Sequence, residues 1–404
     1  MRILMVNNEF PPLGGGTGTV NRALLQRWTS APNLEIDLIT SALGRDYQRE
    51  QFAPSIRLHF VPVNNQNLHH SSNRELTAFA LRALPYALRL HRTRPYDFVF
   101  AWSAVPAGAV ALALKQITGL NYLVRVCGPD IPGFEQRYGM LYPLLTPLIR
   151  ATWRFAAHVI AKCDDEAAMI HRVDAKTCVS IVANGVDTDA FTPAVIPDDG
   201  ALRVLCVARL IERKGQHHLI ESLKRLTDSG VNVTLELVGT GDAQAANEAQ
   251  ARVFGIADRV QFAGYVPREE IAKWYANAHV FVLPSYNEGM SVATLEAMAA
   301  GLPIVVTRTG GTKELVQEGV NGLTFQWSDV DTLTAHLKFL ALHRPRAREM
   351  GNASRRRARQ FSWDAAAARY LEMFSTFPQR AAESHPKSRH SLDIAERDFS
   401  LRSK

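Results

Sequence analysis

The chain has 404 residues, which is too long for a single hydrophobic core and indicates two or three domains of about 150 residues each. Its composition, 47% hydrophobic and 21% charged residues, is that of a soluble globular enzyme and excludes disorder as the default expectation. The formal net charge of +7 favours anionic partners such as nucleotides, phosphates or acidic lipid surfaces.

The sequence lacks three kinds of motif, and each lack makes one further class of protein less expected. The arginine-rich run at residues 344–360 has no interleaved aromatic residues, so a solvated helix face explains it and nucleic acid is not expected as a partner. The cysteines, at positions 127, 163, 178 and 206, show no metal-ligand spacing and predict reduced structural thiols. The N-terminal sequence MRILMVNNEF predicts no signal peptide, and no apolar run is long enough to span a bilayer. We therefore expect a cytoplasmic protein.

Short apolar runs alternate with helical stretches along most of the chain. This is the pattern of βαβ units, and it predicts two doubly wound α/β halves built on parallel sheets. The strands expected in the first half are residues 2–6, 35–40, 57–63, 97–102, 121–126, 158–162 and 179–183. Those expected in the second half are residues 202–208, 232–239, 260–264, 280–285 and 303–307.

Three consecutive glycines, residues 14–16, follow the first strand and lead into a helix expected to begin around residues 17–19. Glycine lets the backbone approach a ligand closely, and a helix N-terminus offers free N–H groups to an anion. No Gly-Lys-Ser/Thr follows, and Thr19 stands where the dinucleotide fingerprint needs its last glycine. The loop is therefore either a phosphate cradle of another type or an ordinary tight turn.

Two later stretches of the first half raise the question of membrane contact. Residues 74–92 place Arg74, Arg82, Arg89 and Arg92 on one side of an expected helix, opposite Leu, Phe and Ala. Such a helix can lie on an anionic membrane or be a domain helix with a wet side, and Pro85 is expected to interrupt it. The apolar and aromatic residues 139–159 add to the possibility of a lipid-linked acceptor.

Asp130 follows the strand at 121–126 within CGPD. It is either a functional carboxylate or a turn residue that caps local N–H groups. The segment NGVDTDAF, from Asn184, is interpreted as a tight turn that closes the first half, and it is assigned no chemistry.

The boundary between the halves is predicted at residues 191–200, where Pro, Asp and Gly cluster. The predicted domains are residues 1–190 and 200–360. A final amphipathic helix is expected at residues 361–377, and the polar residues 378–404 are expected to form a disordered tail.

In the second half, the strand at 202–208 is followed by Arg209 and Lys214. Ligands of parallel α/β sheets collect beyond the carboxyl ends of the strands. The planar fork of Arg and the point charge of Lys form a complementary pair for a diphosphate. The alternative interpretation is a solvated basic loop.

Residues 291–300 are apolar almost all round, as in a helix buried on every side, yet they contain Glu296. Ser291 is a plausible N-cap, and Glu288 stands just before it. A carboxylate is rarely buried without a partner, which favours a ligand against Glu296. The two glutamates are about 12 Å apart along a helix axis, which is too far for the two catalytic carboxylates of a glycosidase. This separation suits two groups that bind opposite ends of one ligand.

The string PSYNEGMSVATLEAMAAGLP, with its Glu-x7-Glu spacing, resembles the retaining glycosyltransferases of family 4. Supporting matches are the glycine loop, NGVD at 184–187, ARLIERKG at 208–215, LVGTGD at 237–242, FAGYVPREEI at 262–271 and FSW at 361–363. The resemblance spans nearly the whole chain. It implies the GT-B fold, in which two Rossmann-like domains face each other across a cleft, an N-terminal one for the acceptor and a C-terminal one for the nucleotide-sugar donor. It also implies that the last helix crosses back to the N-terminal domain.

The resemblance also implies roles for individual residues. Arg209 and Lys214 would bind the donor diphosphate, Glu288 would meet the sugar ring, and Glu296 would hydrogen-bond the ribose. Further donor contacts would come from Gly15, Gly16, Val266, Gly289, Met290 and Ser291. The catalytic set would be Glu288, Arg209, Lys214 and Asp130. Many members have a histidine where this chain has Cys127, which leaves Asp130 as the acceptor-side residue.

The chemistry implied is retaining transfer of a hexose-type sugar from a nucleoside-diphosphate sugar to a glycan or lipid-linked acceptor, in cell-surface polysaccharide or glycoconjugate biosynthesis. No metal or other cofactor is expected, because two cations face the phosphates and no Asp-x-Asp motif is present. A peripheral contact with an anionic membrane, on its inner face, is also anticipated. The alternatives are a related sugar-nucleotide epimerase and a non-catalytic nucleotide-sugar-binding protein.

Overall fold

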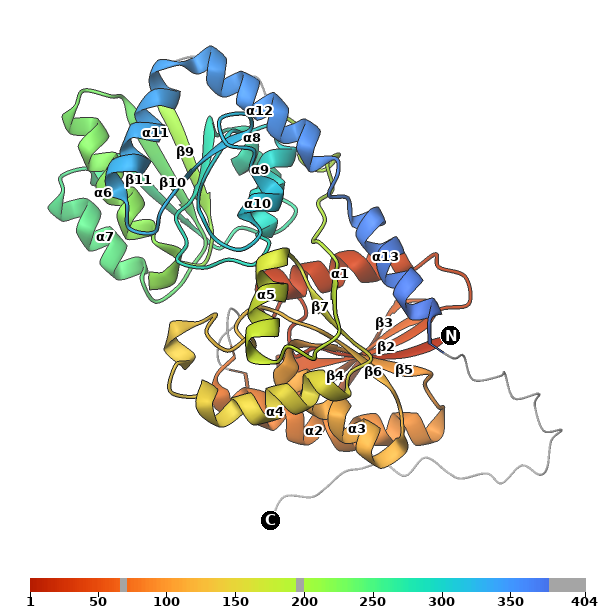
Figure 1. Cartoon of the computed structure of the whole chain (residues 1–404). Helices are drawn as coiled ribbons and strands as arrows, with labels where there is room; N and C mark the ends of the chain where they lie inside the picture. Colours follow the sequence, from red (N-terminus) through yellow and green to blue (C-terminus); the bar gives the residue numbers. More distant parts are fainter. Residues whose placement is uncertain (66–70, 194–199, 378–404) are drawn as a thin grey trace, which may run out of the picture.

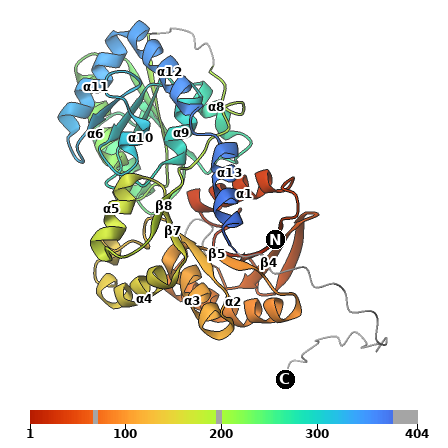
Figure 2. The same cartoon turned by 45° about the vertical axis from the view of Figure 1, so that its right-hand side comes forward.

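Two twisted β-sheets form the frame of the molecule in the computed structural model, which describes residues 1–65, 71–193 and 200–377 (Figure 1). The N-terminal sheet has eight strands in the order β3-β4-β2-β1-β5-β6-β7-β8, and the C-terminal sheet has six in the order β11-β10-β9-β12-β13-β14. Helices cover both faces of each sheet (Figures 1 and 2). The predicted α/β class with two doubly wound halves is confirmed.

The N-terminal domain contains most of the elements before residue 190. Its strands are β1 (Arg2–Val6), β2 (Glu35–Ala42), β3 (Gln48–Ala53), β4 (Ile56–Pro62), β5 (Phe98–Trp102), β6 (Tyr122–Arg125), β7 (His158–Ala161) and β8 (Val179–Ile181). Its helical segments are α1 (Gly16–Trp28), α2 (Asn73–Thr93), η1 (Ser103–Gly108), α3 (Ala109–Thr118), η2 (Gln136–Tyr138), α4 (Tyr142–Phe155) and α5 (Asp164–Val173).

The C-terminal domain repeats the alternation. Its strands are β9 (Leu202–Val207), β10 (Val233–Val238), β11 (Val260–Gly264), β12 (Val280–Leu283), β13 (Ile304–Thr307) and β14 (Gly322–Phe325). Its helical segments are η3 (Glu212–Lys214), α6 (Gln216–Asp228), α7 (Gln244–Val253), η4 (Ala257–Arg259), α8 (Ile271–Ala276), α9 (Val292–Ala299), α10 (Thr312–Leu315), α11 (Val330–Leu342) and α12 (Arg344–Ala358).

Every strand expected from the sequence is present, and all pair in parallel with their neighbours except β3, which runs antiparallel to β4. Strands β1, β5 and β12 are almost wholly buried, as continuous apolar runs covered on both faces must be. Because the carboxyl ends of parallel strands lie at one edge of a sheet, the loops that follow β1, β6, β9 and β12 can all contribute to one site.

The last helix, α13 (Trp363–Ser375), lies against α1 and returns the chain to the N-terminal domain (Figures 1 and 2). The indole Nε1 of Trp28 donates a hydrogen bond to the carbonyl of Ala367 at 3.2 Å, and the rings of Trp28 and Tyr370 meet edge to face. Phe374 packs on Phe98 and Phe100 of the sheet. This aromatic cluster ties the end of the chain to the domain where the chain began.

Helix α2 corrects one expectation. Pro85 does not interrupt it, and the helix runs unbroken from Asn73 to Thr93. Proline removes a single main-chain donor, and Pro85 lies on the exposed side, where its ring displaces no neighbouring element. The opposite side, with Phe79, Ala83 and Ala87, is buried in the domain core, so α2 is a domain helix with a wet face.

Two further sequence predictions fall partly or wholly outside the residues that the structure describes. The predicted boundary at 191–200 lies between the last strand of one sheet and the first strand of the other, but residues 194–199 are outside the described part. The tail predicted at 378–404 is also outside it. Described cysteines form no disulfide, and burial raises the pKa of the Cys206 thiol to about 12.

Candidate functional site

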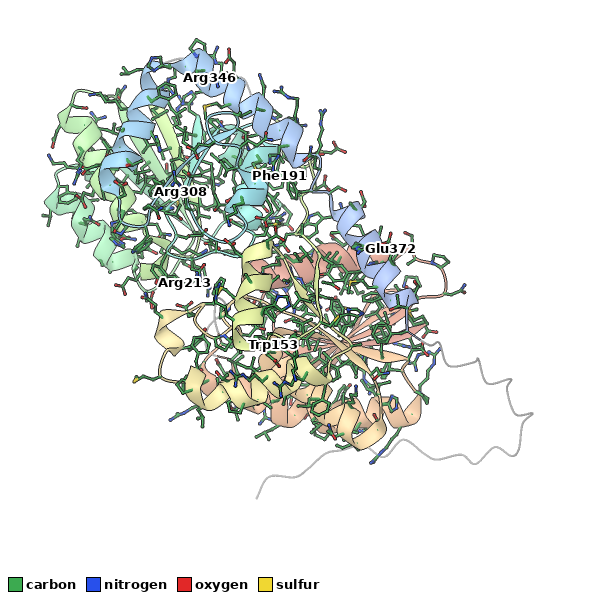
Figure 3. All side chains as sticks on the ribbon, in the orientation of Figure 1. Trp153, Phe191, Arg213, Arg308, Arg346 and Glu372 are labelled. Carbon is green, nitrogen blue, oxygen red and sulfur yellow. The ribbon has the colours of Figure 1, made fainter. Side chains whose placement is uncertain are left out.

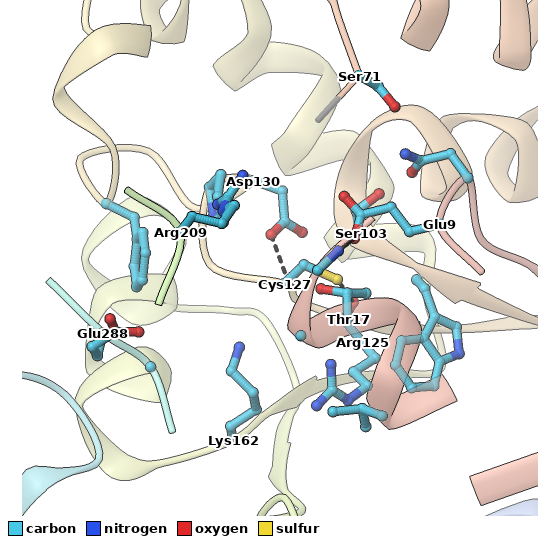
Figure 4. A pocket seen from close by; sticks show the side chains of 18 of the residues that line it. Glu9, Thr17, Ser71, Ser103, Arg125, Cys127, Asp130, Lys162, Arg209 and Glu288 are labelled. Carbon is cyan, nitrogen blue, oxygen red and sulfur yellow. Dashed lines mark hydrogen bonds between the residues drawn. The ribbon is translucent and has the colours of Figure 1, made fainter. Parts of the chain in front are cut away.

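A cavity of about 400 Å³ lies between the two domains, at the carboxyl ends of their strands (Figure 4). Nine residues that the sequence singled out line it. They are Gly15, Gly16, Asp130, Arg209, Lys214, Glu288, Gly289, Met290 and Ser291. The structure does not place Glu296 or Val266 in this lining. Residues from segments nearly 300 positions apart therefore meet in one chamber.

The glycine loop forms one wall of the cavity. Its first glycine, Gly14, has a φ of +91°, a conformation that favours glycine. Gly15 and Gly16 have open space where a side chain would stand, and α1 begins at Gly16. The backbone of this wall is therefore open to a ligand that carries an anion toward the helix N-terminus.

Glu9 lies behind this loop and was missed by sequence reasoning. It accepts a hydrogen bond from Gly15 N at 3.4 Å and lines the cavity. Burial raises the pKa of Glu9, an effect that the Arg209 charge and the Gly15 N–H only partly offset. Its place just after β1, at the carboxyl edge of the sheet, was the signal that could have identified it.

Lys214 and Glu288 form an ion pair at the opposite wall. Burial lowers the pKa of the Lys214 ammonium, and the charge of Glu288 only partly offsets this. Burial alone would raise the pKa of Glu288, but the charges of Lys214 and Arg213 outweigh it and hold this pKa below its usual value. Glu288 is therefore ionised at neutral pH, and Arg209 lines the cavity beside the pair.

The turn after η3 brings Lys214 to this position. Gly215 has a φ of +69°, and any Cβ there would collide with the carbonyl oxygen of Pro284, just after β12. The close approach of these two loops requires glycine, and it fixes Lys214 next to Glu288. The side-chain amide of Gln216 donates to the carbonyl of Arg209 at 2.9 Å and holds the first half of the loop.

Helix α9 points its N-terminus into the cavity. Ser291 is its N-cap, as predicted, and accepts a hydrogen bond from Thr294 N at 3.2 Å. Asn184 donates from Nδ2 to the carbonyl of Met290 at 2.8 Å and accepts from Arg125 at 2.5 Å. Asn184, to which the sequence assigned no chemistry, thus joins the N-terminal domain to the start of α9.

Glu296 is buried, as expected, but it has protein partners. Its carboxylate pairs with Arg268, and Tyr275 donates a hydrogen bond to Oε2 at 2.9 Å. Burial, together with this carboxylate, raises the pKa of Tyr275 well above its usual value. The burial of Glu296 therefore does not by itself require a ligand, because Arg268 already neutralises it. A contact with the ribose stays a prediction.

Asp130 is buried in the turn after β6 and accepts two main-chain hydrogen bonds, from Ala104 N at 2.6 Å and Cys127 N at 2.7 Å (Figure 4). Burial raises the pKa of Asp130, and the two hydrogen bonds and the charge of Lys162 offset this rise only in part. The turn-forming interpretation of Asp130 accounts for both oxygens. Burial and the neighbouring Asp130 also raise the pKa of the Cys127 thiol to about 12, so it is a neutral group.

Lys162 extends into the cavity from the end of β7 (Figure 4). Its ammonium lies 2.5 Å from Glu166 Oε1 and donates to the carbonyl of Val126 at 3.2 Å. Across the cleft, Arg213 pairs with Glu135 at 2.8 Å and donates to the carbonyl of Asn287 at 3.0 Å (Figure 3). The sequence gave no sign of Arg213, because its partners are distant along the chain. Lys162 was missed because it stands in no recognised motif, although Glu166 is only four residues away.

Within residues 1–65, 71–193 and 200–377, no group of three or more His, Cys, Asp or Glu side chains could hold a metal ion. The same residues contain no helix with the length and apolarity needed to cross a bilayer.

Family models match both halves of the chain. Residues 14–190 match the model described as Glycosyltransferase Family 4, and residues 188–357 match the one described as Glycosyl transferases group 1. Together these matches cover the chain from the glycine loop to the last turn of α12.

Two curated relatives and one solved structure illustrate the likeness. The GDP-mannose-dependent alpha-(1-6)-phosphatidylinositol monomannoside mannosyltransferase of Mycolicibacterium smegmatis is 34% identical over 47% of this chain, and the chain spans only about half of it, 54%. The GDP-mannose-dependent monoacylated alpha-(1-6)-phosphatidylinositol monomannoside mannosyltransferase of Corynebacterium glutamicum is 25% identical, over 94% of this chain and 99% of the relative.

The solved structure is the sucrose-phosphate synthase of Thermosynechococcus elongatus. It superposes with a TM-score of 0.83 at 22% identity, covering 93% of this chain and 98% of the synthase. At that identity the likeness concerns the fold alone. The likeness shows that the chain has the GT-B fold. The two family models, which together span residues 14–357, show that the chain belongs to the family 4 glycosyltransferases.

Proposed function

We propose that the protein transfers a hexose from a nucleoside-diphosphate sugar to a glycan or lipid-linked acceptor, with retention of configuration. The observation that carries this proposal is the convergence of Arg209, the Lys214–Glu288 pair and the N-terminus of α9 on one interdomain cavity. Two cations and a helix N-terminus are suited to a diphosphate, and the ionised Glu288 is suited to sugar hydroxyls.

In this proposal the reaction is substitution at the anomeric carbon. The bond between that carbon and the diphosphate oxygen breaks, a bond to the acceptor oxygen forms, and the acceptor's proton leaves with the departing phosphate. Arg209, Lys214 and the N–H groups at the start of α9 stabilise the charge that develops on the leaving group. Glu288 orients the sugar ring, and Asp130 shapes the acceptor side by holding its turn. No metal ion is required when these cations face the phosphates.

The names of the two curated relatives support a more specific proposal for the donor sugar. Both are named as GDP-mannose-dependent enzymes that act on phosphatidylinositol mannosides. We extend this to the present chain as mannosyl or glucosyl transfer in the synthesis of a cell-surface polysaccharide or glycolipid, carried out in the cytoplasm. The chain segments that contribute Lys214, Glu288 and Ser291 lie within the matched C-terminal model.

The donor can be identified by thermal denaturation of the full chain with a panel of nucleoside diphosphates and their sugars. A cognate donor at one hundred times its dissociation constant is expected to stabilise the protein by about 2.7 kcal/mol. Nucleoside monophosphates are expected to give a smaller shift, because they lack the second phosphate for Arg209 and Lys214. If no nucleoside diphosphate or nucleotide sugar shifts the transition, the proposed function is wrong.

Helix α4 favours a lipid-linked acceptor. Leu145 and Ile149 on one side of the helix, with its N-cap residue Leu141, line the cavity. Leu144 and Leu148 on the neighbouring side, with Met140 just before the helix, are exposed by 76%, 38% and 93%. Apolar side chains on both sides of one helix could lie on a membrane and guide an acyl chain toward the cavity, with the exposed Arg150 next to anionic headgroups.

We expect the Met140→Gln/Leu144→Gln variant to bind vesicles of anionic phospholipid at least tenfold more weakly than the wild-type chain. The contact that the variant loses is hydrophobic, so the binding that remains is mainly electrostatic. Raised salt should therefore weaken this remaining binding further. Flotation or co-sedimentation with vesicles measures this, and Leu81→Gln, on α2 and 71% exposed, is the matched control. Equal binding of wild type and the α4 variant would remove α4 from the membrane proposal.

A further inference from the structure

A second cavity of about 330 Å³ lies beside the main one, and we call it the α5 groove. Residues of α5 in the N-terminal domain, including Asp165, Glu166 and Arg172, line one side of it. The loops after β12 and β13, with Tyr286 and Arg308, line the other side. Glu288 lines both cavities, so the α5 groove continues from the proposed sugar position.

The three carboxylates of the α5 groove already have cationic partners. Each one forms an ion pair with a lysine, and none of these three lysines lines the groove. The pairs are Glu166 with Lys162 at 2.5 Å, Asp165 with Lys313 at 3.2 Å, and Glu288 with Lys214. The negative charges of this groove are therefore compensated without its arginines.

The two arginines of the α5 groove have no such compensation. Among the residues that the structure describes, no carboxylate lies within ion-pair distance of Arg172 or Arg308. Arg308 donates from Nε to the hydroxyl of Thr324 at 2.9 Å, which fixes its planar group in place (Figure 3). Arg172 stands in the last turn of α5 and is exposed. These two arginines give the groove an excess of positive charge, which is suited to binding an anion.

We propose that the α5 groove binds an anionic group, a phosphate or a carboxylate, carried on a sugar of the acceptor. This rests on the proposed function. The donor diphosphate has its own cations, Arg209 and Lys214, in the main cavity, so Arg172 and Arg308 are left for a second anion. Tyr286, 38% exposed, adds a ring face of the kind on which sugars pack. Because both domains line the groove, acceptor binding also favours their approach.

The test uses the full chain saturated with the nucleoside diphosphate that stabilises it most. Glucose 6-phosphate, glucuronate and neutral glucose are titrated in, and binding is followed by saturation-transfer NMR or calorimetry. The two anionic sugars are expected to bind at least tenfold more tightly than glucose. In Arg172→Gln/Arg308→Gln this preference should disappear while the affinity for the nucleotide stays unchanged. Arg348→Gln/Arg356→Gln, which replaces two exposed arginines of α12 that line neither cavity, is the charge-matched control.

Three results would overturn the proposal. They are equal binding of anionic and neutral sugars by the wild-type chain, an unchanged preference in the double variant, and a loss of donor affinity in the double variant. The last result would assign the groove to the donor sugar instead of the acceptor. Failure of the nucleotide itself to bind would contradict the proposed function, which the saturation step reports separately.

Discussion

Lys214→Ala is expected to lower the rate of nucleoside diphosphate release from the cognate donor at least a hundredfold. Lys214 lines the main cavity, where its side chain is 13% exposed, so water solvates charge on a leaving group there only in part. Removing one group that stabilises developing charge in such a site typically costs about 10² to 10³ in rate. Release of the nucleotide in the presence and absence of acceptor, followed by a coupled assay, measures the effect.

The same substitution leaves Glu288 without its lysine partner, so stability must be measured beside activity. Breaking a buried ion pair by removing one partner costs up to about 3–5 kcal/mol, and the thermal transition should fall accordingly. Lys214→Ala/Glu288→Gln restores neutrality and should recover much of that stability but little of the activity. Lys224→Ala, which breaks an exposed pair with Asp228, is the control. A rate within threefold of wild type for Lys214→Ala would exclude this lysine from the chemistry.

The fold was predictable because its signals are local. Short continuous apolar runs such as those of β1 and β5 are typical of strands buried on both faces, and their alternation with helical stretches indicates the class. The two strands that were missed lack that signal. β3 (QREQFA) is mostly polar and exposed at the edge of its sheet, and β14 has only four residues and begins with glycine. Their pairing with β4 and β13 decides their structure.

The candidate site likewise contains residues that local sequence signals predict and residues that they do not. Arg209, Lys214 and Glu288 lie in the segments that follow β9 and β12, so their meeting at the carboxyl edge follows from the alternation of strands and helices. The contact of Asn184 with Met290 depends on how the two domains face each other, which no local pattern encodes. Lys162 pairs with Glu166, four residues further along the same domain, but neither residue stands in a motif that the sequence analysis recognised. Glu296 shows the limit of reasoning from burial. Its charge is balanced by Arg268, which comes from a loop 28 positions away whose sequence gave no sign of this contact.

At Gly289 the two domains approach each other closely within the site. A Cβ added there would lie 2.7 Å from Lys162 Cε and closer still to Glu166 Oε1, both in the N-terminal domain. We expect Gly289→Ala to displace the ends of the Lys162 and Glu166 side chains and lower turnover by up to about a hundredfold, since misplacing groups in the site by about 1 Å can cost that much. Nucleotide affinity should change less, because Arg209 and Lys214 stay in place. Gly44→Ala, whose Cβ would lie 3.6 Å from Gln48, is the control.

A rescue experiment separates contact between the domains from contact with the donor. If the added methyl group acts by striking Glu166, then Gly289→Ala/Glu166→Ala should turn over faster than the product of the two single effects predicts, because the obstructing side chain is gone. If the methyl group instead strikes the bound sugar, the two effects should simply multiply. Steady-state rates of the four proteins decide between these outcomes. Only the first is compatible with a glycine that Lys162 and Glu166 require where the two domains meet.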